Sequence, residues 1–494
     1  MVRVRLVLLI GCLLALIAAP AAATAVPPGS GITHGVVVGD VRADSAHLWA
    51  RSGGPGVLHV RLSGGPHASV TPVELTPAHD FTGQAALTGL DPDTRYDYRA
   101  WVSAGAPGRG RGPAVLGSFR TAPAADDAQA VRLAFGGDIS GQNVCRDAVE
   151  GIPIAATIET WDPDVFVGLG DMIYADDLCL ATGRYGNSQL PRDIAQATDL
   201  AGFWGHWRYN RADPKLQSLL ATTGYVGVWD DHEVLNDFGP LSDTRATPPY
   251  DPNVHLMPLG RQAFQDYTPL TRVPSDPNRL YRSIRYGAHL ELIVLDNRQY
   301  RDANIAPDDP ADPKTMLGAE QLAWLKTTLA SSTATWKVVV SSVPMSIPTG
   351  FPPTNGRDGW ANFDQTTGFE QELLDILRFA DEHGIDDLVW ITTDIHFAEA
   401  FRYTPFEESP DFVIHEIATG PMNAGIFPNQ AFDDTLDPER LAFFGPQSPE
   451  AVTSWEQAKG WFNFGTLEIE PDGTLIAGIV DGHGGSQFEL ELDP

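Results

Sequence analysis

The chain has 494 residues, of which 43 % are apolar and 20 % are charged, a composition typical of globular proteins and unlike that of disordered or collagen-like chains. Its 33 Lys and Arg residues stand against 64 Asp and Glu residues, which gives a formal charge of −31. Because so acidic a body repels polyanions, we exclude nucleic-acid binding and polybasic membrane attachment. An anionic substrate would need local positive charge, which bound metal ions supply.

The first residues have the pattern of an export signal. Two arginines precede an apolar run, Leu6–Ala19, and small residues follow it. This pattern predicts a secretory signal peptide over residues 1–25 and a secreted, periplasmic or cell-wall protein without a transmembrane segment. An uncleaved anchor and lipidation at Cys12 are the alternatives. The leader lacks a twin-arginine pair, so the export route stays open.

Residues 31–121 contain short alternating segments bounded by Gly, Pro, Asp or Ser, the pattern of a small antiparallel β-sandwich. The segment Leu87–Tyr96 resembles the tyrosine corner of fibronectin type III domains, in which the hydroxyl of a tyrosine caps the backbone. We therefore predict a fibronectin-III-like domain over 31–121. The segments expected to be strands are Gly35–Val38, Ala46–Ala50, Val57–Leu62 and Tyr96–Val102.

From residue 130 to residue 494 the chain alternates short apolar runs with longer mixed stretches, which predicts a layered α/β domain. Helices are expected over Gly318–Ala330 and from Phe369 to Ala380, where apolar residues share one face. The runs expected to be buried strands are Val131–Phe135, Val165–Leu169, Tyr225–Trp229, Leu290–Leu295, Trp336–Val340 and Leu388–Thr393.

Two cysteines, Cys145 and Cys179, remain once the leader is removed. Both lie in loops that follow strands expected to be neighbours in one sheet. Because an exported protein meets an oxidising compartment, we expect these cysteines to form a disulfide. Two free buried thiols are the alternative.

Polar side chains suited to metal binding follow several of the expected strands. Because the carboxyl ends of parallel strands meet at one edge of a sheet, these separate segments are expected to converge there. The side chains, grouped by segment, are Asp138; Asp171, Tyr174 and Asp176; Asp230, Asp231, His232 and Asn236; Asp296 and Arg298; and Asp394 and His396.

This set of side chains suits a hydrolytic site with two metal ions. Carboxylate, amide, imidazole and phenolate ligands are compatible with iron, manganese, zinc and calcium. Two ions close together need a bridging carboxylate and hold the attacking and leaving oxygens of a displacement at phosphorus. Asp171 is the expected bridge, because Gly170 before it lets the backbone turn tightly.

The ordered motifs Gly-Asp-x-x-Tyr, Trp-Asp-Asp-His-Glu, Leu-Asp-x-Arg-Gln-Tyr-Arg and Asp-x-His resemble those of PhoD-type alkaline phosphatases and phosphodiesterases of the calcineurin-like metallophosphoesterase superfamily. The segment Gly170–Asp176 is also similar to the bridging segment of purple acid phosphatases. The resemblance implies a four-layer αββα domain behind the fibronectin-like domain. It also implies a metal-dependent phosphoric ester hydrolase, in which a hydroxide held by metal attacks phosphorus and phosphate is released.

The resemblance further assigns ligands and a catalytic residue. Asp171, Tyr174 and His396 would hold a ferric ion, while Asp171, Asn236 and Asp394 would hold a second metal, calcium in known relatives. His232 would assist departure of the leaving oxygen. Manganese or zinc are the alternative metals.

One position departs from the family pattern. PhoD-type enzymes commonly carry Cys as the first iron ligand, whereas this chain has Asp138. A carboxylate keeps a metal ligand at this position, so we expect Asp138 to bind metal and to shift the metal preference. Substitution by Cys145, seven residues further on, is the less favoured alternative.

Two side chains have more than one expected role. Asp231 ligates the second metal, orients His232 or caps the following turn. Arg298 binds the substrate phosphate bidentately or forms a structural ion pair with Asp296. The alternatives for the whole protein are phosphodiesterase or phospholipase-D-type activity at the same site, and a non-catalytic metal-binding protein of the cell wall.

Overall fold

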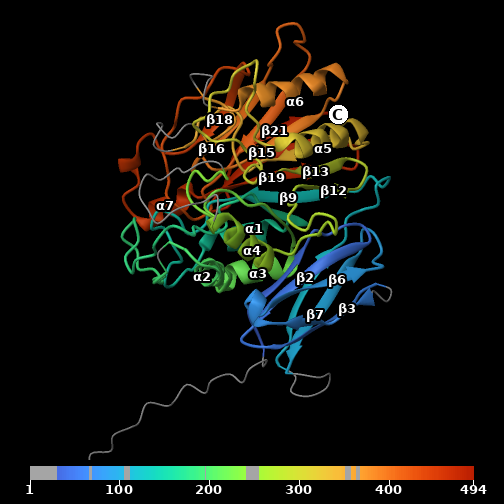
Figure 1. Ribbon diagram of the computed structural model, residues 1–494, viewed down its shortest axis with the longest axis vertical. Helices are drawn as coiled ribbons and strands as arrows, with labels where there is room; N and C mark the ends of the chain where they lie inside the picture. The colour runs from blue at the N-terminus through green and yellow to red at the C-terminus, as the bar shows by residue number, and fades with distance from the viewer. Residues whose placement is uncertain are drawn as a thin grey trace, which may run out of the picture.

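The computed structural model describes residues 31–65, 69–104, 112–194, 196–240, 255–350, 358–362 and 368–494. Two β-sheets pack face to face between two layers of helices, and a small β-sandwich adjoins one helical layer (Figure 1). The expected leader lies outside the described residues. Within these ranges, none of the helices has the length and apolar character needed to cross a membrane.

The larger sheet is mixed, and its centre is parallel because β9, β10 and β11 run in the same direction. Its ten strands lie in the order β21 (Ser486–Leu492), β20 (Leu475–Asp481), β19 (Asn463–Ile469), β9 (Val131–Gly136), β10 (Val165–Gly168), β11 (Gly224–Gly227), β1 (Ile32–Gly39), β2 (Ser45–Ser52), β6 (Thr82–Thr88) and β4 (Ser69–Val70).

The second sheet also has a parallel centre, formed by β13, β14, β15 and β17. Its seven strands lie in the order β12 (Arg282–Tyr286), β13 (Leu290–Val294), β14 (Trp336–Val340), β15 (Leu388–Thr392), β17 (Ile414–Ala418), β16 (Ala398–Tyr403) and β18 (Pro438–Phe444).

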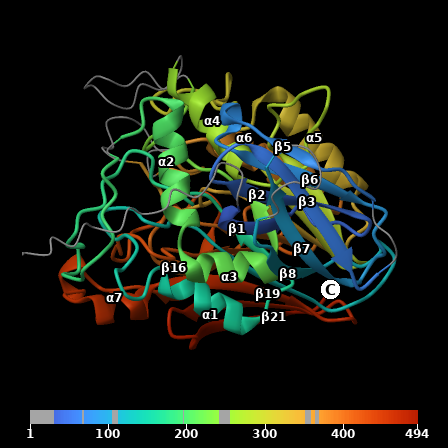
Figure 2. The same cartoon turned by 90° about the horizontal axis from the view of Figure 1, so that it is seen from below.

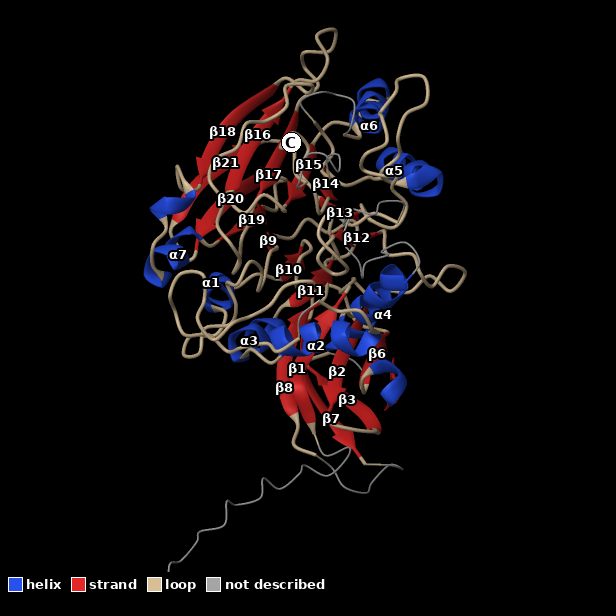
Figure 3. Ribbon diagram, turned by 60° about the vertical axis from the view of Figure 1, so that its left-hand side comes forward, coloured by secondary structure: helices blue, strands red, loops and turns tan. Residues whose placement is uncertain are grey.

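Helices cover the outer face of each sheet (Figure 3). The ten-stranded sheet is covered by α1 (Pro153–Trp161), α2 (Leu200–Arg211), α3 (Pro214–Thr222) and α4 (Met257–Tyr267), and the short α7 (Trp455–Trp461) packs into the same cluster. The seven-stranded sheet is covered by α5 (Gly318–Ser331) and α6 (Glu370–Glu382). This arrangement confirms the expected four-layer αββα domain.

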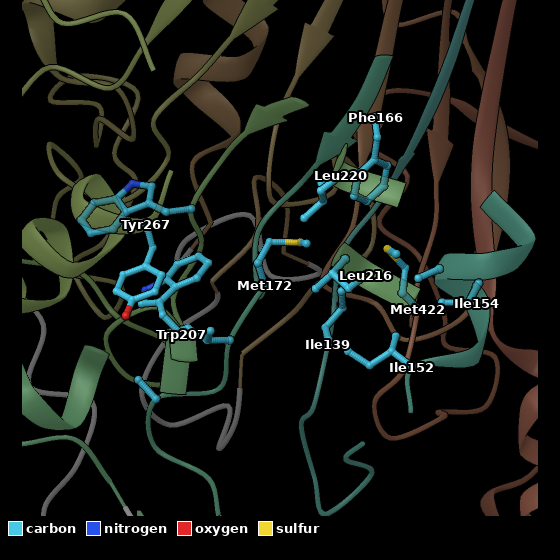
Figure 4. Packing of buried hydrophobic residues seen from close by; sticks show 14 of the residues in the cluster. Ile139, Ile152, Ile154, Phe166, Met172, Trp207, Leu216, Leu220, Tyr267 and Met422 are labelled. Atoms are coloured by element: carbon cyan, nitrogen blue, oxygen red, sulfur yellow. The ribbon is translucent and has the colours of Figure 1, made fainter. Parts of the chain in front are cut away.

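The central strands are apolar on both faces because each face is covered. In β9 and β10, Leu133 and Val167 pack against the second sheet, while Ala134 and Phe166 pack against the helices. Figure 4 shows part of the helix-side cluster, including Phe166 of β10 and Leu220 of α3. Burial on both faces explains why these strands appear in the sequence as nearly continuous apolar runs.

The N-terminal sandwich packs a four-stranded sheet against β1, β2 and β6. The four strands lie in the order β5 (Val73–Leu75), β3 (Gly56–Ser63), β7 (Arg95–Ser103) and β8 (Val115–Arg120). The hydroxyl of Tyr96 accepts a hydrogen bond of 2.9 Å from the backbone N–H of Asp91, which confirms the tyrosine corner.

The sandwich and the α/β part share one sheet. β1 pairs antiparallel with β2 of the sandwich and parallel with β11 of the α/β part. Seen from below, the sandwich strands lie beside α3 and α4 (Figure 2). Strand pairing therefore fixes the sandwich to the layer that carries the candidate site.

Candidate metal centre and active site

The expected ligands lie where the parallel strands end. Asp138 follows β9, Asp171 follows β10, and Asp394 follows β15. All three have φ angles in the left-handed region, at +63°, +52° and +74°. Such backbone is uncommon for residues with a side chain and tends to gather at functional sites.

Gly170 has the role that the sequence indicates. Its φ is +125°, and a Cβ added there would lie 2.5 Å from Cβ of Asp230. The loops after β10 and β11 therefore approach each other so closely that only glycine fits at position 170.

A first group of ligand-type side chains consists of Asp138, Tyr174 and His396. The hydroxyl of Tyr174 lies 3.2 Å from Oδ1 of Asp138 and 3.1 Å from Nε2 of His396, and these two atoms of Asp138 and His396 are 3.5 Å apart. His396 Nδ1 donates to the carbonyl of Gly425. Since a carbonyl only accepts, Nε2 is the nitrogen left to bind a cation.

The protonation states of this group favour a bound cation. Burial raises the pKa of Asp138 to about 7 and raises the pKa of the Tyr174 hydroxyl well above its usual range. Burial also lowers the pKa of His396 to about 4, which keeps the imidazole neutral, as a metal ligand must be. A cation would offset the cost of ionising the two acidic groups.

A second group consists of Asp171, Asp230, Asp231 and Asp394, each of which offers an oxygen within 4.8 Å of the others. Burial is the main cause that raises the pKa of Asp171 well above its usual range, and the neighbouring carboxylates of Asp231 and Asp230 add to it. The pKa of Asp394 is raised in the same way, by burial first and then by Asp230 and Asp231. Asn236 lines the adjoining cavity, so its amide oxygen belongs to the same surroundings.

Three of these carboxylates keep an oxygen without a hydrogen-bond partner among the described residues. The three atoms are Oδ2 of Asp171, Oδ2 of Asp230 and Oδ2 of Asp394, all of them buried. An unpartnered buried carboxylate oxygen is costly unless a cation neutralises it. The chemistry and the unfilled bonding capacity of the group therefore fit one or more hard metal ions.

His232 lies beside both groups and faces the cavity. Its Nδ1 is 2.6 Å from Oδ1 of Asp176, and its ring centroid is 4.0 Å from that of Tyr174. Burial disfavours the charged imidazole, but the carboxylates of Asp176 and Asp231 outweigh burial and raise the pKa of His232 to about 10. The imidazole therefore carries a proton near neutral pH.

The cavity that joins these side chains has a volume of 450 Å³. Its lining includes Asp231, His232, Asn236, Asp394 and His396. A space of this size accommodates a small ester together with its leaving group. The structure thus brings together eight of the nine residues predicted to act in the site.

Arg298 is the exception, and its expected role as a substrate ligand is corrected by the structure. The side chain is fully buried, and its guanidinium contacts Asp230 and Asp358 at 2.6 Å each. Its backbone N–H, rather than its guanidinium, bonds the carboxylate of Asp296. The side chain has no remaining access to substrate because buried carboxylates occupy its donors.

Asp231 performs the capping role among its three expected roles. Its Oδ1 accepts from the backbone N–H of His232 at 2.8 Å, and its Oδ2 accepts from the backbone N–H of Asp237. These bonds shape the turn that presents His232. The same carboxylate remains within the second group, so capping leaves its metal-ligand role open.

The sequence did not predict that three carboxylates hold the loops and charged side chains of the site in position. Glu233 is buried and accepts hydrogen bonds from the backbone N–H groups of Asp171, Met172 and Asp230, so it ties the loops after β10 and β11 together. Asp176 and Asp358 are the others, each paired with a cation far away in the sequence. For Glu233 the available signal was its place in the Trp-Asp-Asp-His-Glu motif.

A disulfide joins the loops that carry the first ligands. Cys145 and Cys179 are bonded, with their Cα atoms 5.9 Å apart. Arg192 supports the same region, because its guanidinium donates to the carbonyls of Tyr174 and Asp177 at 3.1 and 2.8 Å. Cys145 is therefore not positioned to replace Asp138 as a ligand.

Comparisons with known proteins agree with this geometry. The family model described as PhoD-like phosphatase matches residues 134–472, and the model described as PhoD-like phosphatase, N-terminal domain, matches residues 18–123. Alkaline phosphatase D of Bacillus subtilis (strain 168) is 27 % identical over 418 residues, which cover 76 % of this chain and 66 %, just under two thirds, of that protein.

Two solved structures share the fold. The structure of PhoD superposes with a TM-score of 0.72 at 20 % identity and covers 94 % of this chain and 92 % of its own. A purple acid phosphatase from yellow lupin (Lupinus luteus) gives a TM-score of 0.60 at 12 % identity, covering 94 % of this chain and 74 % of its own. Since the first family model spans more than half of the sequence, the chain belongs to the PhoD-like phosphatase family.

Proposed function

We propose that this protein is a metal-dependent hydrolase of phosphoric esters, similar to alkaline phosphatase D. The proposal is carried by two features that meet at one cavity. The first are the unpartnered carboxylate oxygens of Asp394, which lines the cavity, and of Asp171 and Asp230 beside it; the second is the imidazole of His232, which also lines it. The first supply a place for cations that attract phosphate, and the second supplies a proton for a leaving oxygen. Membership of the PhoD-like phosphatase family supports the same reaction class.

The residues that would hold metal ions fall into two sets that share Asp171. When bound, the ions supply Lewis-acid chemistry, which neutralises charge on phosphoryl oxygens and lowers the pKa of water. We propose ferric iron for the set that contains the phenol and calcium for the set of carboxylates and amide, with manganese or zinc as alternatives. The sets are Asp138, Asp171, Tyr174 and His396, and Asp171, Asp231, Asn236 and Asp394.

His232 is the proposed general acid. Its protonated ring faces the cavity, and Asp176 accepts its Nδ1 proton, so Nε2–H is directed to donate to the departing alkoxide. Asp176 also accepts from the backbone N–H of Asn236 at 3.0 Å. One carboxylate thereby orients both the proton donor and a proposed ligand.

We further propose that the protein is exported after removal of residues 1–25, and that it comprises a fibronectin-III-like domain over 31–121 and a catalytic domain over 130–494. The Cys145–Cys179 disulfide supports an oxidising compartment. N-terminal sequencing of the protein from the culture medium tests export. A mature chain that still begins at Met1 would contradict the proposal.

The function is tested by metal analysis together with ester hydrolysis. Purified protein should contain at least two metal ions per chain. It should hydrolyse p-nitrophenyl phosphate, bis-p-nitrophenyl phosphate or both. The ratio of the two rates assigns monoester or diester preference. Tightly bound metal without hydrolysis of any phosphoric ester would instead favour the non-catalytic metal-binding protein.

A further inference from the structure

Most of the exposed large hydrophobic side chains of this protein lie on two neighbouring loops. Six such side chains are exposed among the described residues, and four belong to these loops. The four are Val149, Leu178, Leu180 and Leu190, with exposed fractions of 92 %, 47 %, 55 % and 39 %. Scattered exposed hydrophobic residues are ordinary, whereas a concentration marks an interaction surface. We name these four side chains the aliphatic patch.

The two loops that carry the four side chains are bound to each other. Segments 146–148 and 188–190 are joined by backbone hydrogen bonds of 2.8 and 2.9 Å. The disulfide Cys145–Cys179 adds a covalent link between the loops. Cys179 is buried in extended chain, so the residues before and after it point away from the core. The exposure of Leu178 and Leu180 is thus fixed by the fold.

One side chain of the aliphatic patch, Leu178, lies close to the cavity of the candidate site. Leu178 directly follows Asp177, whose carboxylate accepts a hydrogen bond of 2.6 Å from the backbone N–H of Gln142. Gln142 in turn lines the cavity. The blue-green loops at the left-hand edge of Figure 1, below α7, carry the patch. A surface that covers the patch therefore comes close to the cavity.

The charge of the protein selects among the surfaces that the patch can meet. A formal charge of −31 repels anionic membranes, whereas a zwitterionic phospholipid surface has no net charge and accepts aliphatic side chains. A second copy of the chain fits less well. A stable dimer buries roughly 800 Å² per partner, and four partly exposed side chains offer on the order of a few hundred Å².

We propose that the aliphatic patch docks this protein on zwitterionic phospholipid surfaces such as phosphatidylcholine. Docking depends on the four side chains alone. Its consequence for catalysis, which is that phosphodiester headgroups are presented to the cavity, rests on the proposed function.

Vesicle sedimentation tests the docking. Full-length mature protein is mixed with phosphatidylcholine vesicles, and the bound fraction is compared with that of the Leu178→Asp/Leu180→Asp variant. The matched control is Leu116→Asp, which changes a 69 % exposed leucine on β8 of the sandwich. We expect the double variant to lower the vesicle partition coefficient at least about tenfold. The control should bind like the wild type, and anionic phosphatidylglycerol in the vesicles should weaken binding.

Three results would overturn the proposal. The first is no binding of the wild-type protein to phosphatidylcholine, and the second is an equal loss of binding in the Leu116→Asp control. The third is a dimer in sedimentation velocity that the double variant dissociates, which would assign the patch to a second copy. Soluble-ester turnover separates this proposal from the proposed function. It should stay within about twofold in the double variant, and a fall as large as that of binding would assign the leucines to folding instead.

Discussion

Two groups of buried carboxylates meet at the carboxyl ends of the strands, and they are balanced in opposite ways. Asp230 and Asp358 are each 2.6 Å from the guanidinium of Arg298. Asp171 and Asp394 form no ion pair with any described residue. All three of Asp171, Asp394 and Asp230 keep a buried oxygen without a partner, so the ion pair to Arg298 is what sets Asp230 apart. The chain neutralises the first pair itself and leaves the second pair for a cation. The difference separates a structural cluster from a proposed functional one.

The largest effect is expected from Asp171→Asn, because it removes the carboxylate shared by the two proposed ligand sets. Metal content and ester turnover should fall together, with turnover lowered by about 10³-fold or more. Elemental analysis and a p-nitrophenyl phosphate assay measure the two. Glu416→Gln is a matched control, since it neutralises another fully buried carboxylate and should leave metal content unchanged. Full activity in Asp171→Asn would contradict the proposal that Asp171 binds metal while Asp230 and Asp358 serve the structure.

Arg298→Met tests the other side of the comparison. It leaves Asp230 buried without its cation and leaves Asp358 with Arg301 alone, so the free energy of unfolding should fall by about 3–5 kcal/mol. Denaturant unfolding of metal-free protein measures this loss. A variant with unchanged stability and a raised KM would restore Arg298 as a substrate ligand.

His232→Asn separates proton donation from metal binding. Metal content should be retained, while turnover of alkyl phosphates should fall by about 10²–10³-fold. Turnover of p-nitrophenyl phosphate should fall less, because its leaving group needs less help from a proton donor. Asp176→Asn should give a smaller loss with the same leaving-group pattern, since it acts through His232. Equal losses for both leaving groups would contradict the assignment of His232 as general acid.

Metal removal should change how stability depends on pH. The folded-state pKa of Asp138 is raised to about 7, above its value in the unfolded chain. The contribution of Asp138 to the free energy of unfolding is therefore fully present below about pH 4. It is lost as pH rises toward 7, at up to about 1.4 kcal/mol per pH unit. Thermal unfolding of chelator-treated protein at pH 5 and pH 7 measures the slope, with metal-loaded protein as reference. An identical slope in the two forms would show that Asp138 does not bind the metal.

Much of the fold could be predicted because its signals are local. The apolar runs beginning at Val131, Val165, Leu290, Trp336 and Leu388 all became buried strands, since a strand covered on both faces needs apolar side chains at nearly every position. The strands β16 to β21 were not predicted. β18 and β21 pair antiparallel and are partly exposed, and the buried strands β16, β17 and β19 pair with strands whose place the local sequence does not give.

The sequence by itself determined the order of the candidate ligands and their place after strands, because both follow from periodicity and motif spacing. Only the tertiary structure decided what each charged side chain faces. Arg298 meets Asp358 across 60 residues, His232 meets Asp176 across 56, and β1 joins the sheet beside β11. These contacts depend on which loops the layers bring together, and no local pattern encodes that. The same packing decides that Asp171 is left for a cation while Asp230 is paired.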